Sequence, residues 1–318
     1  MNFKQIDSKG TREGYAVVKT ADIKKTTKGA DYLDLTLADN SGEINAKLWE
    51  YNGENVQPFD FVKVRGSISS YNGVEQLRVD KIRKVTDADD VDIGDYVPSA
   101  CAPGQLMYDE ILAIVNQFTD TELMKLVTFI LNNEKGKLLY WPAAKSNHHA
   151  VRGGLLMHTL SMLRLADTAC SIYAFVNKDL LFSGIILHDI AKLEELSVAP
   201  IGIAGEYTTK GNLLGHLVAG AMYVDRTGRE LGISEDKLLL LEHMLISHHG
   251  QPEWGAAKVP MTVEAELLSQ LDVLDARMNE YSAAIASTEE NTFSAPQKAL
   301  GGKSVYNHGC EENITCLV

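Results

Sequence analysis

The sequence predicts a two-domain protein in which a small β-barrel precedes an all-α domain. Residues 14–85 contain short segments rich in β-branched residues, separated by turn signals. Residues 105–284 instead carry apolar residues at three- and four-residue spacing, which is typical of amphipathic helices. With 318 residues, the chain is also long enough for two domains that each bury a core of their own.

Five short strands are predicted in the first domain. Turn signals fall at residues 39–42 and 71–73, and five strands in a segment of this length predict a small closed barrel. Aromatic and basic side chains could make this barrel a single-strand-binding surface, although some aromatics would instead fill its core and exposed lysines often only protect a sheet edge. The residues concerned are Tyr32, Trp49, Tyr51, Phe61 and Tyr71, with Lys24, Lys25, Lys28, Lys63 and Arg65.

An acidic segment without periodicity separates the two predicted domains. Helices are predicted after it, over residues 105–116, 121–132, 153–173, 178–195, 212–227, 234–247 and 262–284. The helical periodicity is then lost. We therefore divide the chain into a barrel domain (1–86), an acidic linker (87–105), a helical domain (106–284) and a flexible tail (285–318).

The net charge of −13 is unevenly distributed along the chain. Residues 1–86 carry 14 Lys and Arg against 12 Asp and Glu, a net charge of +2, whereas residues 87–318 carry 16 against 31, a net charge of −15. This balance argues against strong capture of long duplexes, which needs a broad basic surface, and remains compatible with short or single-stranded nucleic acids.

Nothing in the sequence indicates a membrane partner. No stretch reaches the roughly 18 consecutive apolar residues of a membrane helix, and the N-terminus lacks the apolar core of a signal peptide. The four Cys show neither CxxC spacing nor the density of a disulfide scaffold. We therefore expect a cytoplasmic protein.

The apolar run GIILHDIAK, residues 184–192, places His188 and Asp189 side by side in the expected interior. A buried carboxylate is costly unless it is paired or bound to metal. Imidazole and carboxylate together suit divalent transition metals, and one Asp can bridge two ions. Lys192 follows Asp189 by three positions, so we expect it on the same helix face, directed at an anionic ligand of the metal.

Further ligand-type residues lie within or at the end of other apolar helical runs. A lone His is more often a core or surface residue than a ligand, but the repeated coincidence with separate helices favours a metal site. The set consists of His158, His216, His248, His249 and Asp272. Together with His188 and Asp189 it would suit two ions. His243 lies five positions before His248, about 500° around a helix, so we expect it to be structural.

The order of these residues resembles that of the HD superfamily of metal-dependent phosphohydrolases. The strings KSNHH, LHDIAK, GNLLGH and SHHGQPEWG are similar to the YhaM family of 3′→5′ exoribonucleases, over residues 12–282 or so. The resemblance implies that the barrel is an OB-fold. It also implies two ligand sets that share Asp189: His158, His188, Asp189 and Asp272 around one ion, and Asp189, His216, His248 and His249 around the other.

Candidate substrate-binding residues lie outside the ligand set. Lys145, Asn147, His148, His149 and Arg152 form a polar loop before the first ligand helix; composition alone favours a solvated loop, and the resemblance makes phosphate or sugar contacts an equal alternative. Trp254 directly follows the paired histidines, where it could stack on a base or lie in the core. On the barrel, the candidates are Lys24, Lys25, Lys63 and Arg65.

These features favour a metal-dependent nuclease acting on single-stranded RNA, with DNA as an alternative substrate. The resemblance implies that it is a 3′→5′ exonuclease that releases nucleoside 5′-monophosphates. The expected cofactors are two divalent ions, Mn²⁺ first, with Co²⁺, Fe²⁺ or Zn²⁺ as alternatives. The ions would bind phosphate oxygens and activate a water, with Asp189 holding the ions and Lys192 neutralising charge in the transition state.

Two other functions stay open. An HD-domain phosphodiesterase for cyclic or short nucleotides would have the same core, but it has little need of an OB-like domain. A non-catalytic nucleic-acid-binding protein would not need all of the proposed metal ligands, and every one of them is present. The oligomeric state is not set by the sequence, and a homo-oligomer is compatible with it.

Overall fold

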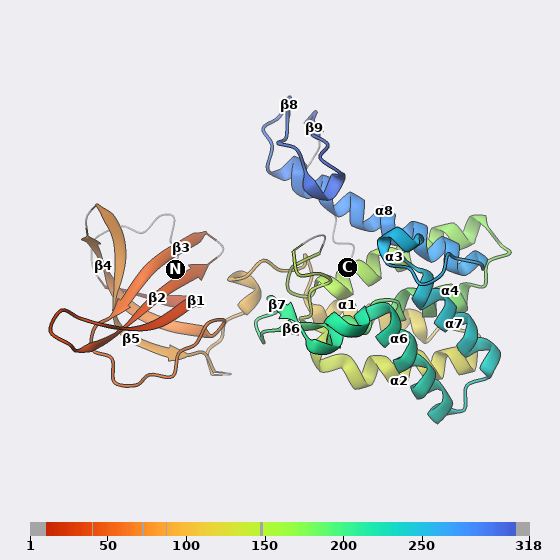
Figure 1. Cartoon of the computed structure of the whole chain (residues 1–318), viewed down its shortest axis with the longest axis horizontal. Coiled ribbons are helices and arrows are strands. Elements are labelled where there is room, and N and C mark those ends of the chain that lie inside the picture. Colours follow the sequence, from red (N-terminus) through yellow and green to blue (C-terminus); the bar gives the residue numbers. More distant parts are fainter. Residues whose placement is uncertain (1–10, 40, 72, 87, 147–148, 310–318) are drawn as a thin grey trace. The chain divides into compact units, whose positions relative to one another are not determined.

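The computed structural model describes residues 11–39, 41–71, 73–86, 88–146 and 149–309 (Figure 1). Two of the predicted substrate-binding residues, Asn147 and His148, lie outside this part of the chain. The internal contacts divide the protein into two compact units, residues 1–99 with 199–203 and residues 100–198 with 204–318. Within the described residues, no helix combines the length and the apolar composition needed to cross a membrane.

The first unit contains the predicted five-stranded barrel. Its strands are β1 (Thr11–Lys25), β2 (Asp31–Asp39), β3 (Gly42–Leu48), β4 (Phe61–Tyr71) and β5 (Val74–Lys84). They close in the order β1-β2-β3-β5-β4, and β3 pairs with β5 in parallel while the other pairs are antiparallel. This is the connectivity of an OB-fold, which confirms the expected fold.

Apolar side chains at every second position of the strands fill the barrel. In β2, Leu33, Leu35 and Leu37 are buried and their neighbours are more exposed, as the two-residue period of a strand requires. Close approach of β4 and β5 requires Gly66, because a Cβ at this position would lie 2.2 Å from the carbonyl oxygen of Arg78. The register of the two strands shifts at the same place, between Arg65 and Gly66.

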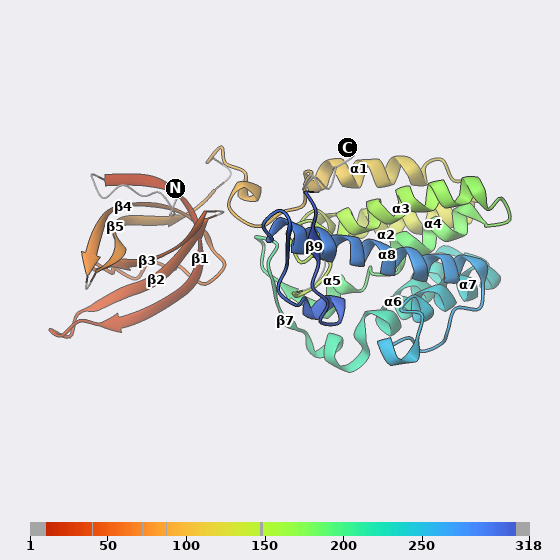
Figure 2. The same ribbon diagram turned by 90° about the horizontal axis from the view of Figure 1, so that it is seen from above.

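The second unit is helical. Its α-helices are α1 (Gly104–Val115), α2 (Thr121–Leu138), α3 (Gly154–Ile172), α4 (Lys178–Leu187), α5 (Lys192–Glu195), α6 (Thr209–Leu231), α7 (Glu235–Ser247) and α8 (Val263–Ala286). Side-chain caps fix several helix starts; Asp120, Asn177, Thr208 and Thr262 each accept a hydrogen bond from a backbone N–H of the first turn. Helices α3 and α8 pack along each other (Figure 2) and carry ligand-type residues.

The prediction of one helix over residues 178–195 is wrong. Helix α4 ends at Leu187, and α5 begins only at Lys192. The physical reason is local: the Ile185 carbonyl, which would accept the N–H of residue 189 in a continuing helix, accepts the ring N–H of His188. A short hairpin that the sequence did not predict then follows, formed by β6 (Leu196–Val198) and β7 (Ala204–Tyr207).

Regular structure also continues beyond residue 284, where the helical periodicity of the sequence ends. Strands β8 (Thr292–Phe293) and β9 (Tyr306–Asn307) pair in an antiparallel hairpin, and Leu300 and Val305 pack against Ala284 near the end of α8. Figure 1 shows this hairpin at the end of α8. The flexibility of residues 285–318 stays a prediction.

Candidate metal centre

Two histidines stand at helix ends in the same arrangement. His188 follows α4, and its Nδ1 lies 2.7 Å from the carbonyl oxygen of Ile185. His248 follows α7, and its Nδ1 lies 2.7 Å from the carbonyl oxygen of Leu245. A carbonyl only accepts, so each Nδ1 carries the hydrogen and each Nε2 keeps a lone pair for a ligand bond. Among the described residues, neither of these buried Nε2 atoms has a hydrogen-bond partner.

Asp189 lies between two groups of imidazoles and is almost fully buried. Its Oδ2 is 3.3 Å from Nε2 of His188 and 2.6 Å from Nζ of Lys192. Its Oδ1 is 3.3 Å from Nε2 of His216 and 3.9 Å from Nε2 of His248. Burial alone would raise the pKa of Asp189, but His188 and Lys192 hold that pKa well below its ordinary value. Asp189 is therefore an anion with one oxygen directed at each group.

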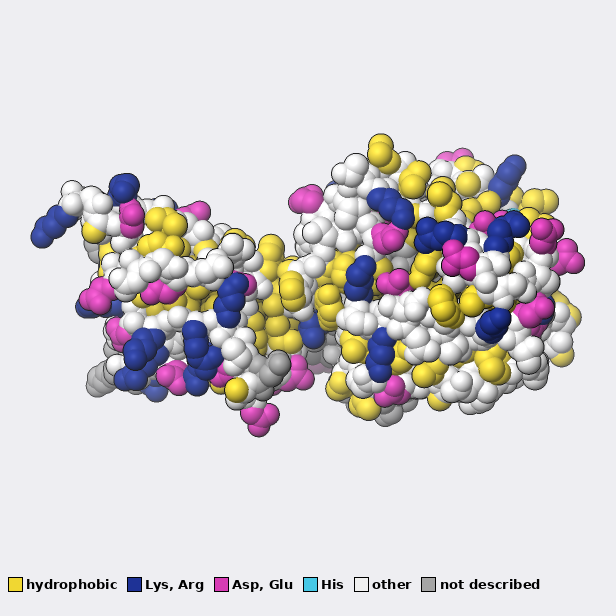
Figure 3. All heavy atoms as spheres, turned by 90° about the horizontal axis from the view of Figure 1, so that it is seen from below, with side chains coloured by type: hydrophobic (Ala, Val, Ile, Leu, Met, Phe, Trp, Pro, Cys, Tyr) yellow, Lys and Arg dark blue, Asp and Glu magenta, His cyan; other side chains and the backbone are white. Residues whose placement is uncertain are grey.

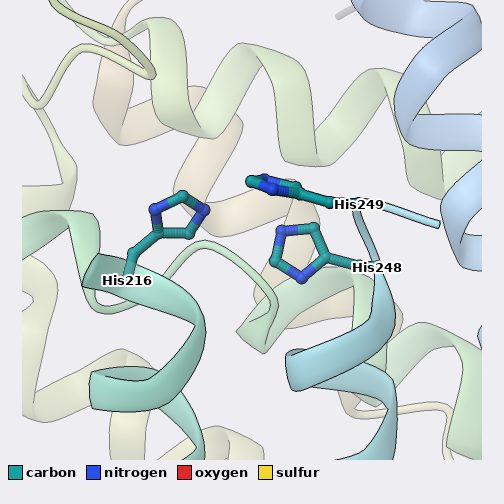
Figure 4. A group of neighbouring side chains, drawn as sticks. All are labelled: His216, His248 and His249. Carbon is teal, nitrogen blue, oxygen red and sulfur yellow. The ribbon is translucent and has the colours of Figure 1, made fainter. Parts of the chain in front are cut away.

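The rings of His216, His248 and His249 turn toward one another (Figure 4), and their ligand atoms lie within 4.8 Å of one another. Nδ1 of His216 is 3.1 Å from both carboxylate oxygens of Glu195, and Nδ1 of His249 is 2.8 Å from the carbonyl oxygen of Trp254. Burial lowers the pKa of His248 and of His249, which keeps these imidazoles in the neutral form that binds metals.

His158 and Asp272 complete the other side. Nε2 of His158, in α3, is 3.3 Å from Oδ1 of Asp272, in α8, and its Nδ1 is 2.6 Å from Oδ2 of Asp275. Burial would lower the pKa of His158, but the two carboxylates raise it to about 10. His158, His188 and Asp189 offer ligand atoms within 4.8 Å of one another, as do His188, His248 and Asp272. The structure thus brings all seven predicted ligand residues together.

These residues fit divalent metal ions. Four buried atoms in the group have no hydrogen-bond partner among the described residues, namely Nε2 of His188, His216 and His248 and Oδ1 of Asp189. Leaving such atoms unsatisfied costs about 1–3 kcal/mol each. Coordination would remove that cost, and the donor set of imidazole nitrogens and carboxylate oxygens suits first-row transition metals.

A cavity of about 250 Å³ opens beside this group. Asp189, Lys192, His249, Trp254 and Asp272 line it, together with Val273 and Ala276. Lys192 was predicted to face the metal site, and Trp254 was predicted either to stack on a base there or to lie in the core. The structure places both residues at this cavity. The indole of Trp254 is well exposed. A ligand in the cavity would therefore meet carboxylates, an ammonium group and an aromatic face.

Comparison with known proteins agrees with this geometry. Residues 155–277 match the model of the HD domain, and this range includes all seven predicted ligand residues. A protein of Bacillus subtilis (strain 168) named 3′-5′ exoribonuclease YhaM is 35% identical over 295 residues, which cover 92% of this chain and 93% of that protein. The chain belongs to the YhaM family.

Solved structures similar to this YhaM family member match about a quarter of its length. One is a replication protein A heterotrimer bound to single-stranded DNA, 20% identical, covering 25% of this chain and 61% of that chain with a TM-score of 0.21. Another is the second OB-fold domain of replication protein A from Methanococcus maripaludis, 23% identical, covering 24% and 83% with a TM-score of 0.20.

The polar loop before α3 is engaged with the rest of its unit in this YhaM family member. Lys145 pairs with Glu206 at 2.7 Å, and the guanidinium of Arg152 lies 5.5 Å from the ring centre of Tyr140. His149 is buried, with Nε2 2.7 Å from Oδ2 of Asp275. The residues that line the 250 Å³ cavity do not include these three side chains. Their contact with substrate stays a prediction, and the position of His149 better suits a role in holding Asp275.

The basic residues predicted on the barrel mostly have acidic partners. Lys24 pairs with Asp34 at 2.6 Å, Lys25 with Asp31 at 2.9 Å, and Lys63 with Glu13 at 3.1 Å. Arg65 lines a pocket of about 350 Å³ that also includes Lys63, Arg83 and acidic residues. Figure 3 shows Lys and Arg interspersed with Asp and Glu on the visible face of the barrel. Binding of nucleic acid by these four residues stays a prediction.

A more open aromatic surface lies on β2 and β3. The rings of Tyr32 and Trp49 stack with centroids 4.7 Å apart, and Trp49 is exposed. Nζ of Lys47 lies 5.5 Å from the first ring centre and 5.6 Å from the second. We call these three residues the aromatic platform. In contrast, Tyr51 and Phe61 pack against apolar clusters of their unit.

Three residues of interest were missed from the sequence. Asp275 and Glu195 hold the rings of His158 and His216, and Lys47 joins the aromatic platform. Asp275 follows the predicted ligand Asp272 by three positions on the same helix, so helix geometry could have placed both on one face. Glu195 follows Lys192 by the same interval. Lys47 carries no signal that separates it from any other strand lysine.

Proposed function

We propose that this protein is a metal-dependent 3′→5′ exoribonuclease that hydrolyses single-stranded RNA to nucleoside 5′-monophosphates. The observation that carries the proposal is the position of Asp189, whose two oxygens face two groups of imidazoles beside an open cavity. A pair of metal ions sharing one carboxylate is the arrangement used to hydrolyse phosphodiesters. The name of the Bacillus subtilis relative supports the polarity and the RNA substrate.

Two ions would divide the site between them. We propose that His158, His188, Asp189 and Asp272 hold one, and that Asp189, His216, His248 and His249 hold the other. Mn²⁺ is the first expectation, and Co²⁺, Fe²⁺ and Zn²⁺ suit the same ligands. When bound, the ions would neutralise the phosphate and lower the pKa of a water molecule.

Lys192 supplies a fixed positive charge at the cavity. Burial would lower the pKa of Lys192, but the ion pair with Asp189 raises it, so the side chain is an ammonium at neutral pH. An ammonium that is already in place can stabilise the negative charge that grows on a phosphate without further reorganisation. We therefore assign Lys192 to binding and stabilising the scissile phosphate.

Trp254 is proposed to stack on a base at the mouth of the cavity. Replacing it with Ala removes the indole and keeps the backbone carbonyl that holds His249. Loss of one stacking contact of about 1–3 kcal/mol should raise KM for single-stranded RNA roughly 5- to 150-fold. Steady-state kinetics of the variant and the unaltered protein would measure this KM. The small substrate bis-p-nitrophenyl phosphate is the control, because the two proteins should hydrolyse it with the same kinetic constants. Equal KM values for RNA would show that Trp254 does not contact a base.

The aromatic platform is proposed to bind single-stranded nucleic acid. Base stacking accepts any base and does not read the sugar, so we expect both RNA and DNA to bind here. Trp49→Ala should weaken binding of a labelled single strand by about 1–3 kcal/mol, measured by fluorescence anisotropy. Phe293→Ala, which also removes an exposed aromatic ring but from the C-terminal hairpin, is the control. If both variants weaken binding equally, the platform has no specific role.

The function is tested by incubating the metal-loaded protein with single-stranded RNA or DNA labelled at the 5′ end. A 3′→5′ exonuclease shortens the labelled strand stepwise and releases 5′-monophosphates. A single internal cut, or removal of the label as the first product, would contradict the proposal. Cyclic dinucleotides form a separate arm, because their hydrolysis with RNA left intact would favour the alternative phosphodiesterase function.

A further inference from the structure

Glu195 holds both the backbone and the ring of His216. Its Oε1 accepts the backbone N–H of His216 at 3.0 Å, and Nδ1 of the ring lies 3.1 Å from Oε1 and from Oε2. The carboxylate is largely buried, with 11% of its side chain exposed. Burial would raise the pKa of Glu195, but the hydrogen bonds from His216 lower it. One side chain thus fixes the position and the orientation of another.

The local backbone is built around this contact. Gly215, directly before His216, has a φ of 66° inside α6, and this kink turns the N–H of His216 toward Glu195. A Cβ on Gly211 would lie 2.4 Å from the carbonyl oxygen of Glu195, so glycine is required where the first turn of α6 meets the end of α5. The same carbonyl accepts the N–H of Thr208 at 2.9 Å.

His216 differs from its two neighbours in the way its ring is held. Nδ1 of His248 and Nδ1 of His249 donate to backbone carbonyls, which no substitution of a side chain removes. Nδ1 of His216 donates to a carboxylate, and its Nε2 then lies 3.3 Å from Oδ1 of Asp189. Within this group of three histidines, the aim of His216 therefore depends on a side chain.

We propose that Glu195 is the positioning residue for the metal ion held by His216, His248 and His249. The carboxylate fixes the tautomer in which Nε2 carries the lone pair and directs that lone pair at the ion. Partners of this kind typically change metal affinity 10- to 100-fold. Glu195 is absent from the lining of the 250 Å³ cavity, so it acts through His216 and not on the substrate. This inference rests on the pair of ions in the proposed function.

The test is a titration of the metal-free, full-length protein with Mn²⁺ alone, followed by calorimetry, with Co²⁺ and its visible spectrum as a second probe. Glu195→Gln keeps the size of the side chain and removes its charge. We expect this variant to lower the affinity for one ion about 10- to 100-fold and to leave the affinity for the other ion within roughly threefold of its original value. Glu194→Gln is the matched control, since this neighbouring carboxylate is exposed and pairs with Lys210. It should bind both ions like the unaltered protein.

A second pair of variants assigns the affected ion. In a His216→Ala background, Glu195→Gln should add little further loss, because the two changes remove the same contact. Asp275→Asn alters the carboxylate that holds His158, so it should instead lower the affinity for the ion that His158 is proposed to hold. Thermal melting of each metal-free variant monitors folding.

Two outcomes would overturn the inference: unchanged affinities in Glu195→Gln, or a full additional loss in the His216→Ala background. If the unaltered protein binds only one ion, the metal pair of the proposed function fails. The role of Glu195 is then decided by whether Glu195→Gln lowers the affinity for that single ion.

Discussion

Asp189→Ala is expected to abolish hydrolysis of RNA and to release the metals. The carboxylate faces both groups of imidazoles, so its removal takes a ligand from each proposed ion and leaves the ammonium of Lys192 buried without its partner. Loss of a single electrostatic contact in a transition state costs about 10²–10³ in kcat, and loss of the ions should exceed that. Product sizing on labelled RNA and metal analysis by mass spectrometry would measure both effects.

His243→Ala is the matched control for that experiment. This histidine lies in α7, the helix that ends just before His248, but its Nε2 accepts the backbone N–H of Met261 at 2.9 Å and takes no part in the candidate ligand groups. The variant should keep both ions and nearly full activity, with a modest loss of stability. An Asp189→Ala protein that retains two ions and near-normal activity would rule out the bridging role. Loss of an ion from His243→Ala would show that the second ligand set is wrong.

Removal of metal is expected to lower the melting temperature of the helical unit strongly. The metal-free site holds four buried polar atoms without hydrogen-bond partners among the described residues, and bound ions would satisfy them. An ion present at 1,000 times its Kd stabilises the folded state by about 4 kcal/mol. For a unit of this size, that corresponds to roughly 8–16 °C. Scanning calorimetry with and without Mn²⁺, after chelation and dialysis, would detect the shift.

The control for this measurement is Asp189→Ala under the same two conditions. Because the variant lacks the shared ligand, Mn²⁺ should move its melting temperature by much less. Equal shifts in both proteins would mean that Mn²⁺ stabilises the fold from somewhere other than this centre. The absence of any shift in the unaltered protein would contradict metal binding at this site.

Much of the fold was predictable because burial leaves a periodic signal. The alternation of Leu33, Leu35 and Leu37 reports the inner face of a strand, and the helices of the second unit carry apolar residues at helical spacing. Candidate ligand residues such as His158 and His216 were recognisable since polar groups inside such apolar runs need a partner. Sequence position and chemistry were sufficient for these residues.

The parts that were missed depend on contacts that leave no periodic signal. The end of α4 is set by a hydrogen bond from the ring of His188 to the carbonyl oxygen of Ile185, and the apolar run itself continues past it. Glu195 and Asp275 look like ordinary surface carboxylates until the chain brings them to His216 and His158. Lys47 becomes a candidate only because its Nζ lies over the stacked rings of Tyr32 and Trp49.

The ends of α4 and α7 share an arrangement that constrains the length of both helices. In each, a histidine bonds to the carbonyl three residues earlier, and the residue that follows also belongs to the ligand set. Consecutive side chains on a continuing helix point about 100° apart, so the stop allows His188 and Asp189, like His248 and His249, to face one space. Inserting one residue within either helix would turn its final pair by about 100° and shift it by about 1.5 Å. We therefore expect these helices to tolerate changes of residue type more readily than changes of length.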